Sequence, residues 1–213
     1  MKIVIVEDER LFRDVLRKAC IQDMGHTVVG EAGTGREALE IIPIVAPDLL
    51  ILDLNLPDID GLAVLEELRR KRALLRTLII SSYCDEFTIY CVERANVQGF
   101  VDKSTNTIAE LTEAIRLIAA GGTYHSDRFK TAKAIRTENP RSFDKLLTAR
   151  EQTILAYLGE PLSDPEIAAK LNLSPETIEK HRFNIMHKLG FRSRAEAARY
   201  ARRCGLTRPL PRS

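Results

Sequence analysis

Three acidic side chains and one lysine in the first half of the chain each follow a short apolar run: Glu7, Asp8, Asp53 and Lys103. Open parallel sheets place their chemistry at the carboxyl ends of their strands, so we expect these side chains to converge. Clustered carboxylates repel one another unless a cation lies among them, and Mg²⁺ prefers hard oxygen ligands. The set therefore indicates a divalent-metal and phosphoryl site in which Asp53 can attack phosphorus.

The elements that would carry these residues alternate along the chain. Apolar runs predict five strands, and helical spacing of apolar residues predicts helices between them. The strands are expected at 2–6, 27–31, 48–52, 77–81 and 98–102, and helices at 35–45, 61–72 and 107–120. Such alternation predicts an α/β, doubly wound, five-stranded parallel sheet covered on both faces. Ser81 would end the fourth strand at the same edge, where its hydroxyl can donate to a phosphoryl oxygen.

Residues 1–122 resemble the receiver domain of bacterial two-component response regulators. Several features carry this resemblance together, because their order and spacing match. They are the pair Glu7-Asp8, Asp53 with Pro57 and Gly61 after it, Ser81 ending an apolar run, and the segment Gly99–Lys103.

The resemblance implies that Asp53 accepts a phosphoryl group from a sensor histidine kinase. It further implies that the side chains of Asp8 and Asp53 and the backbone carbonyl of Asn55 coordinate Mg²⁺, with Glu7 close by. Glu7 stands where many members of the family carry aspartate, and its longer side chain still permits metal binding.

The same resemblance implies that Ser81 and Lys103 bind the new phosphoryl oxygens and that Phe100 is a switch aromatic that turns inward. An alternative for Phe100 is an ordinary core ring. A phosphatase or phosphotransferase also places an aspartate at a strand tip, but it would want a second carboxylate two residues later, where this chain has Asn55. We therefore expect no enzyme beyond a receiver that accepts a phosphoryl group on itself and can lose it again.

Charge divides unevenly along the 213 residues. Residues 1–122 carry a net charge of −6 and residues 123–213 a net charge of +8, which indicates that only the second half meets a polyanion. The four cysteines form no C-x-x-C pair, which favours free thiols in a reducing cytosol. No stretch approaches the ~20 apolar residues of a membrane span, so we expect a cytoplasmic protein without a membrane partner.

Helix-start signals predict four helices in the second half, at 149–158, 164–171, 175–189 and 194–203. Three capping boxes begin at Thr148, Ser163 and Ser193, and Ser174 followed by Pro175 gives a fourth start. Only two residues separate the second helix from the Ser174 cap, which is typical of a helix-turn-helix. Before these helices, apolar periodicity lapses over 123–145, which we interpret as a linker.

The helix expected at 175–189 offers a polar face suited to major-groove edges and phosphates. Phe183 on this face can touch a thymine methyl, pack on a neighbouring subunit or remain exposed. The candidate DNA-binding residues are Thr177, Glu179, Lys180, Arg182, Phe183, Asn184, His187 and Lys188.

Residues 146–208 resemble the LuxR-type DNA-binding domain, through Thr148, Glu166-Ile167-Ala168 and Lys188-Leu189-Gly190 among others. The whole chain resembles the NarL/FixJ class of response regulators. The resemblance implies double-stranded DNA as a partner and a homodimer formed through the last helix, with Ala197, Tyr200 and Ala201 as the contact residues. RNA polymerase is a further candidate partner.

Together these features predict a phosphorylation-controlled, DNA-binding transcriptional regulator. It would have a receiver at 1–122, a linker at 123–145 and a DNA-binding domain at 146–208. An alternative is a DNA-binding regulator that works without phosphorylation and uses its receiver only to dimerise.

Overall fold

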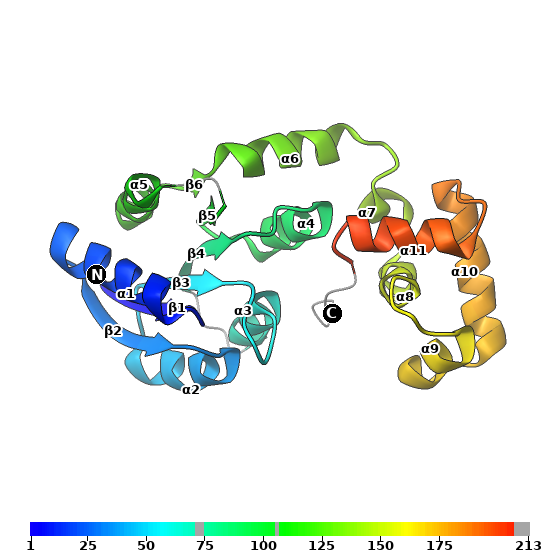
Figure 1. Cartoon of the computed structure of the whole chain (residues 1–213), viewed down its shortest axis with the longest axis horizontal. Helices are drawn as coiled ribbons and strands as arrows, with labels where there is room; N and C mark the ends of the chain where they lie inside the picture. Colours follow the sequence, from blue (N-terminus) through cyan, green and yellow to red (C-terminus); the bar gives the residue numbers. More distant parts are fainter. Residues whose placement is uncertain (71–74, 105–106, 207–213) are drawn as a thin grey trace. The chain divides into compact units, whose positions relative to one another are not determined.

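The structure, a computed structural model, describes residues 1–70, 75–104 and 107–206. The chain divides into two compact units. Among the described residues, the first contains Met1–Cys84 and Cys91–Ala132, and the second contains Asp85–Tyr90 and residues 133–206. Figure 1 colours the elements of both units along the sequence. Among the described residues, no helix is both long enough and apolar enough to cross a membrane.

The first unit is built on a parallel sheet with the strand order β2-β1-β3-β4-β5-β6. The strands are β1 (Lys2–Val6), β2 (Thr27–Ala32), β3 (Leu49–Asp53), β4 (Arg76–Ser81), β5 (Gly99–Asp102) and β6 (Tyr124–His125). The five predicted strands are confirmed, but the predicted count was wrong by one. The sixth strand has two residues, which is too short for a periodic signal, and it pairs in parallel with β5.

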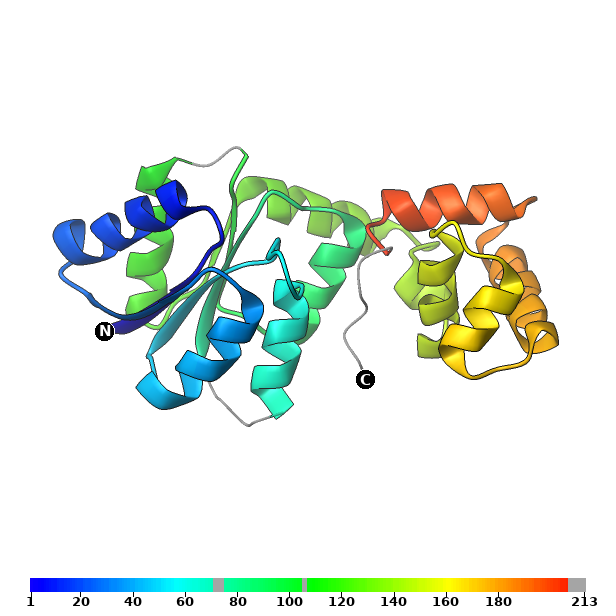
Figure 2. The ribbon, with the colours of Figure 1, turned by 60° about the horizontal axis from the view of Figure 1, so that its bottom comes forward.

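Helices cover both faces of this sheet (Figure 2). Leu16 and Ile115 pack with Ile3, Ile51 and the other inward side chains of one face. That face is covered by α1 (Arg10–Lys18), which a π-helical turn at Ala19–Asp23 extends, and by α5 (Ile108–Ala119). The helices α2 (Gly35–Val45) and α3 (Gly61–Arg70) lie on the opposite face. The last two residues of the helix predicted at 61–72 lie outside the described residues.

The segment after β6 is helical and packs on the sheet edge. The helix α6 (Asp127–Glu138) begins there, and its Phe129 is only 2% exposed. The ring of Phe129 lies 4.9 Å from that of Phe100 and 4.8 Å from that of His125, measured between centroids. Arg128 pairs with the buried carboxylate of Asp102 at 2.8 Å. The first turns of α6 therefore complete the core of the first unit.

The second unit is helical and begins with the first turns of α4 (Glu86–Ala95). Its other helices are the short α7 (Phe143–Leu146), which was not predicted, and α8 (Ala149–Leu158), α9 (Asp164–Leu171), α10 (Pro175–Leu189) and α11 (Arg194–Arg203). The last four have the predicted bounds. Residues 207–208 of the predicted DNA-binding domain lie outside the described residues.

A tight joint separates α9 from α10. Asn172 ends α9 in the left-handed conformation, with φ of 53°, and the hydroxyl of Ser174 accepts a hydrogen bond from the N–H of Thr177 to begin α10. Ile178 and Ile185 of α10 are fully buried. This pair of helices is the predicted helix-turn-helix, with α10 in the place of its second helix.

Two of the three predicted capping boxes are present. Thr148 and Ser163 each exchange hydrogen bonds with the glutamate three residues later. At the start of α11 the prediction was wrong in part, because the carboxylate of Glu196 accepts from the N–H of Arg192 instead. Ser193 still caps that helix by accepting from the N–H of Glu196.

Candidate functional site

The carboxyl ends of β1, β3, β4 and β5 meet at one edge of the sheet, because all these strands are parallel. Glu7 and Asp53 are buried there, whereas Asp8 is exposed. Each of the three offers a carboxylate oxygen, and these oxygens lie within 4.8 Å of one another. The structure thus brings the predicted acidic residues into one cluster.

Lys103 supplies the positive charge of this cluster. Its Nζ donates to Oε2 of Glu7 at 2.6 Å and to Oδ2 of Asp53 at 2.7 Å. With all three acids ionised, the cluster carries two more negative charges than Lys103 balances. The donor set is oxygen only, and the excess charge is that of a divalent cation. The residues present therefore fit a magnesium ion.

Burial shapes the protonation of this cluster. It raises the pKa of Glu7 to about 7, and the hydrogen bond from Lys103 offsets only part of that rise. Burial alone would lower the pKa of Lys103, but its bonds to Asp53 and Glu7 outweigh burial and raise it. Lys103 is therefore a stable ammonium ion, while Glu7 is only partly ionised near neutral pH in the absence of further positive charge.

The other predicted residues of the phosphoryl site lie around this cluster. The N–H of Asn55 donates to Oδ1 of Asp53 at 3.0 Å, which orients the carboxylate. Ser81 is fully buried, and its hydroxyl oxygen accepts from the N–H of Tyr83 at 3.0 Å. Because that oxygen is an acceptor in this bond, the hydroxyl proton remains free to donate. Phe100 is fully buried and packs against Phe129.

Sequence reasoning missed two residues that shape the site, Phe12 and Arg13, and it named Gly61 without a structural reason. Arg13 donates to the backbone carbonyl of Glu7. The ring of Phe12 lies 5.0 Å from Nζ of Lys103, close enough for a cation–π contact. A Cβ on Gly61 would lie 2.4 Å from the carbonyl oxygen of Asp53, so any other residue there would force the backbone to shift. Phe12 also packs against the core of this sheet face, so its sequence signal is that of a core residue, and no sequence pattern marks the contact of Arg13 with a backbone carbonyl.

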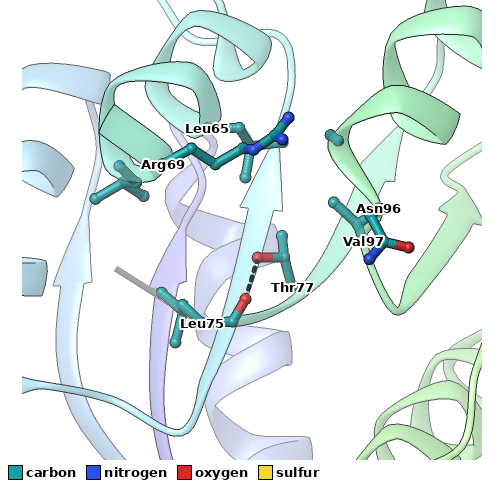
Figure 3. Close-up of a pocket in the computed structure, with 8 residues that line it drawn as sticks. Leu65, Arg69, Leu75, Thr77, Asn96 and Val97 are labelled. Carbon is teal, nitrogen blue, oxygen red and sulfur yellow. Dashed lines mark hydrogen bonds between the residues drawn. The ribbon is translucent and has the colours of Figure 1, made fainter. Parts of the chain in front are cut away.

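A small hollow lies at the opposite end of β4. Figure 3 shows it between Leu65 and Arg69 of α3 and the residues Asn96 and Val97. The hydroxyl of Thr77 donates to the carbonyl of Leu75 at 3.2 Å across its floor. Because Thr77 lies near the start of β4 and Ser81 ends it, this hollow is on the far edge of the sheet from the acidic cluster.

The predicted DNA-binding residues occupy one side of α10 and its flanks. The exposed ones are Glu179, Lys180, Phe183, His187 and Lys188, and the half-buried ones are Thr177, Arg182 and Asn184. The side chain of Phe183 is 68% exposed. Polar, basic and one aromatic side chain therefore share the accessible surface of this helix.

Two of these cations are held by acidic side chains of neighbouring helices. Nε of Arg182 donates to Oδ2 of Asp164 at 2.9 Å. Nζ of Lys188 donates to both carboxylate oxygens of Glu151, at 2.7 and 2.8 Å. Lys188 therefore ties α10 to α8, and Arg182 ties it to the start of α9.

The predicted dimerisation residues lie on the inward face of α11. Ala197 and Ala201 are fully buried, and Tyr200 is 8% exposed, because this face packs inside the second unit. Their spacing of three and four residues marks a buried helix face, and it does not reveal what that face packs against. In this arrangement the three side chains are not available to a second copy.

Two family models match the chain. The response regulator receiver domain matches residues 3–116, and the family of bacterial regulatory proteins called luxR matches residues 145–201. The first match covers the unit that carries the acidic cluster, and the second covers α8 to α11.

Characterised relatives match over nearly the whole chain. The nitrate/nitrite response regulator protein NarP of Escherichia coli is 32% identical over 92% of this chain and 92% of its own. The DNA-binding transcriptional activator DevR/DosR of Mycobacterium tuberculosis is 30% identical over 98% of this chain and 97% of its own.

Solved structures share the fold. RcsB of Salmonella enterica serovar Typhimurium, bound to a promoter in the presence of a phosphomimetic, is 21% identical with a TM-score of 0.68, over 94% of this chain and 97% of that one. The response regulator ChrA of a heme-sensing two-component system is 28% identical with a TM-score of 0.53, over 96% and 98%. The chain therefore belongs to the two-component response regulators that join a receiver domain to a LuxR-type DNA-binding domain, and it is a transcriptional regulator of that family.

Proposed function

We propose that Asp53 of this regulator accepts a phosphoryl group from a sensor histidine kinase, and that this event controls DNA binding by the second unit. The observation that carries the proposal is the contact of Lys103 with Oδ2 of Asp53 at 2.7 Å. A phosphoryl group formed on this carboxylate adds negative charge beside an ammonium that is already in place. Electrostatic stabilisation of that kind is the main contribution a protein makes to phosphoryl transfer.

The acidic cluster supports a role for Mg²⁺ in this step. The carboxylates of Asp8 and Asp53 and the carbonyl of Asn55 would hold the ion, with Glu7 beside it. When bound, Mg²⁺ supplies positive charge that offsets the charge of an incoming phosphoryl group. The hydroxyl of Ser81 has a proton to donate to a phosphoryl oxygen, which would draw it toward Asp53 and away from its present role at Tyr83.

For DNA binding, we propose that α10 enters the major groove. Its exposed face carries Lys180, Phe183 and His187, with Asn184 beside them, and residues 123–213 have a net charge of +8. Lys180 would contact phosphate, and Asn184 can read a base edge. A homodimer would read two half-sites about one helical turn, ~10 bp, apart.

The dimer would use the outward face of α11, because the inward face is buried. Ala195 and Arg199 are exposed on that side. A structure of RcsB is described as two dimers bound to two parallel DNAs, which supports this mode of assembly for the fold. We propose a cytoplasmic protein that works alongside RNA polymerase.

The experiment compares the native chain with Asp53→Asn. The matched control is Asp23→Asn, which removes an exposed acid that does not belong to the acidic cluster. Each protein is treated with acetyl phosphate and Mg²⁺, and its mass and DNA affinity are measured. We expect one added phosphoryl group and altered affinity in the native chain and the control only. Absence of a mass gain in the native chain would refute the proposal. A mass gain without a change in affinity would favour a regulator whose DNA binding ignores phosphorylation.

A further inference from the structure

Asp164 lies at the point where three helices of the second unit meet. It is the first residue of α9, and its side chain is only 16% exposed. One carboxylate oxygen accepts from Nε of Arg182 in the middle of α10, and the other accepts from Arg194 at the start of α11. Arg194 also donates to the carbonyl of Leu162, which fixes it in place. Figure 1 shows α9 and α10 side by side, as this link requires.

The guanidinium of Arg182 is held at one edge. A guanidinium carries five N–H donors in a planar fork, and Asp164 takes the one on Nε. Nη2 forms an ion pair with Oε1 of Glu179 at 3.8 Å, which is too long for a hydrogen bond. The outer N–H groups can therefore still reach a further acceptor while Nε stays on Asp164.

We propose that Asp164 is a positioning residue for DNA binding: it anchors Arg182 by Nε so that the outer guanidinium nitrogens face a DNA phosphate. The inference rests on the proposed function of α10. The side chain of Arg182 is 24% exposed, so it has a path to the surface despite its anchor. Asp164 would act through Arg182 and not through a contact of its own with DNA.

The direction in which one substitution changes DNA affinity distinguishes a positioning role from an effect of net charge. Asp164→Asn makes the second unit more positive by one charge, so charge alone predicts tighter DNA binding. The same substitution leaves Arg182 beside Arg194 without the anion between them, and the two guanidinium groups repel. Positioning therefore predicts weaker binding from a more positive protein.

The test uses the full chain treated with acetyl phosphate and Mg²⁺, and a mixed-sequence duplex of about 30 base pairs, long enough for two half-sites. Binding is followed by fluorescence anisotropy from about 50 to about 200 mM salt. Glu160→Gln is the control, because it removes one negative charge in the loop between α8 and α9. Urea unfolding of every variant checks that it is folded in the assay.

We expect Asp164→Asn to bind about tenfold more weakly than the native chain, which corresponds to about 1.4 kcal/mol. Its salt dependence should be shallower by about 0.9 in log–log slope, the value for one lost phosphate contact. Glu160→Gln should bind at least as tightly as the native chain. In an Arg182→Met background, Asp164→Asn should cause no further loss, because its effect passes through Arg182.

Arg182→Lys gives a test that leaves the start of α9 intact. Lysine keeps the charge but has no Nε to anchor and no planar fork. Positioning predicts that Arg182→Lys binds as weakly as Arg182→Met, and charge alone predicts native affinity. Native affinity in Arg182→Lys, or tighter binding by Asp164→Asn, would overturn the inference and leave the proposed function standing. If the native chain shows no salt-dependent binding to the duplex, both fail.

Discussion

Two lysines of α10 look alike in the sequence but have different surroundings, and the same substitution should separate them. Lys188 donates to both oxygens of Glu151, whose side chain is 5% exposed. Lys180 is exposed. We predict that Lys188→Met destabilises the contact between α8 and α10, whereas Lys180→Met weakens DNA binding without loss of stability.

The magnitude follows from the partners that remain. Hydrogen bonds to charged groups contribute about 1.5–3 kcal/mol. Removing Lys188 costs stability because it leaves the carboxylate of Glu151 poorly solvated and without that partner. The Lys188 side chain is 38% exposed, so solvent screening reduces its share. Glu151 also keeps its hydrogen bonds from the N–H and hydroxyl of Thr148. We therefore expect a loss of about 1–2 kcal/mol.

The pKa of Glu151 gives this effect a pH dependence. Burial alone would raise that pKa, but hydrogen bonds from Lys188 and Thr148 outweigh burial and lower it below the ordinary 4.5. A carboxyl with a lowered pKa stabilises the fold above its unfolded pKa, and the contribution is lost as pH falls through the folded pKa. The difference in unfolding free energy between the native protein and Lys188→Met should therefore become smaller as the pH falls below 4.5.

Hydrogen–deuterium exchange of the α8 and α10 amides, measured in increasing urea, reports this local stability. Anisotropy with a labelled duplex reports DNA binding in parallel. Lys180→Met is the matched control, with a stability change within about 0.5 kcal/mol, as is usual at exposed positions. If Lys188→Met exchanged at the same rates as the native chain, the ion pair with Glu151 would not be a stabilising contact and the reasoning would be refuted.

Three further predictions concern the receiver unit. Because burial raises the pKa of Glu7 from 4.5 to about 7, the metal-free protein should lose stability as pH rises through that window, by up to about 3 kcal/mol. Mg²⁺ should restore that stability, and in Glu7→Gln the urea midpoint should vary less with pH. Gly61→Ala should cost about 1–3 kcal/mol and slow phosphorylation by acetyl phosphate, since its Cβ would lie 2.4 Å from the carbonyl oxygen of Asp53 and 2.8 Å from Cα of Leu54. Native stability in that variant would show that the backbone can yield. Phe129→Ala should destabilise the same unit by about 3–5 kcal/mol in urea unfolding, whereas an unchanged midpoint would mean that α6 is not part of its core.

Much of the fold could be predicted because its signals are local. The strands of the sheet are near-continuous apolar runs, as burial on both faces requires. The bounds of α8 to α11 follow from side-chain caps such as Thr148 and Ser163, whose partners lie three residues away. The strand β6 was missed because two residues, Tyr124 and His125, carry no period, and their pairing with β5 is a tertiary contact.

The candidate site likewise has a part that the sequence predicts and a part that depends on tertiary contacts. Asp53 and Lys103 could be placed at one sheet edge from strand topology alone, although they are 50 residues apart. Which cations of α10 are free could not be predicted, because the acids that hold Arg182 and Lys188 lie 18 and 37 residues away. Helix periodicity shows which side chains face outward, but it does not reveal which neighbouring helix supplies a counter-ion.

The short strand β6 also bears on how regulators of this kind can exchange output modules by recombination. A gene fusion joined directly after residue 122 would remove β6 and Phe129, and so bare the ring of Phe100 and the unpaired backbone of β5. Such an edge invites pairing with other chains. A junction beyond Ala132 keeps β6 and Phe129, so crossovers there should leave the β5 edge covered and lower the tendency of chimeras to aggregate.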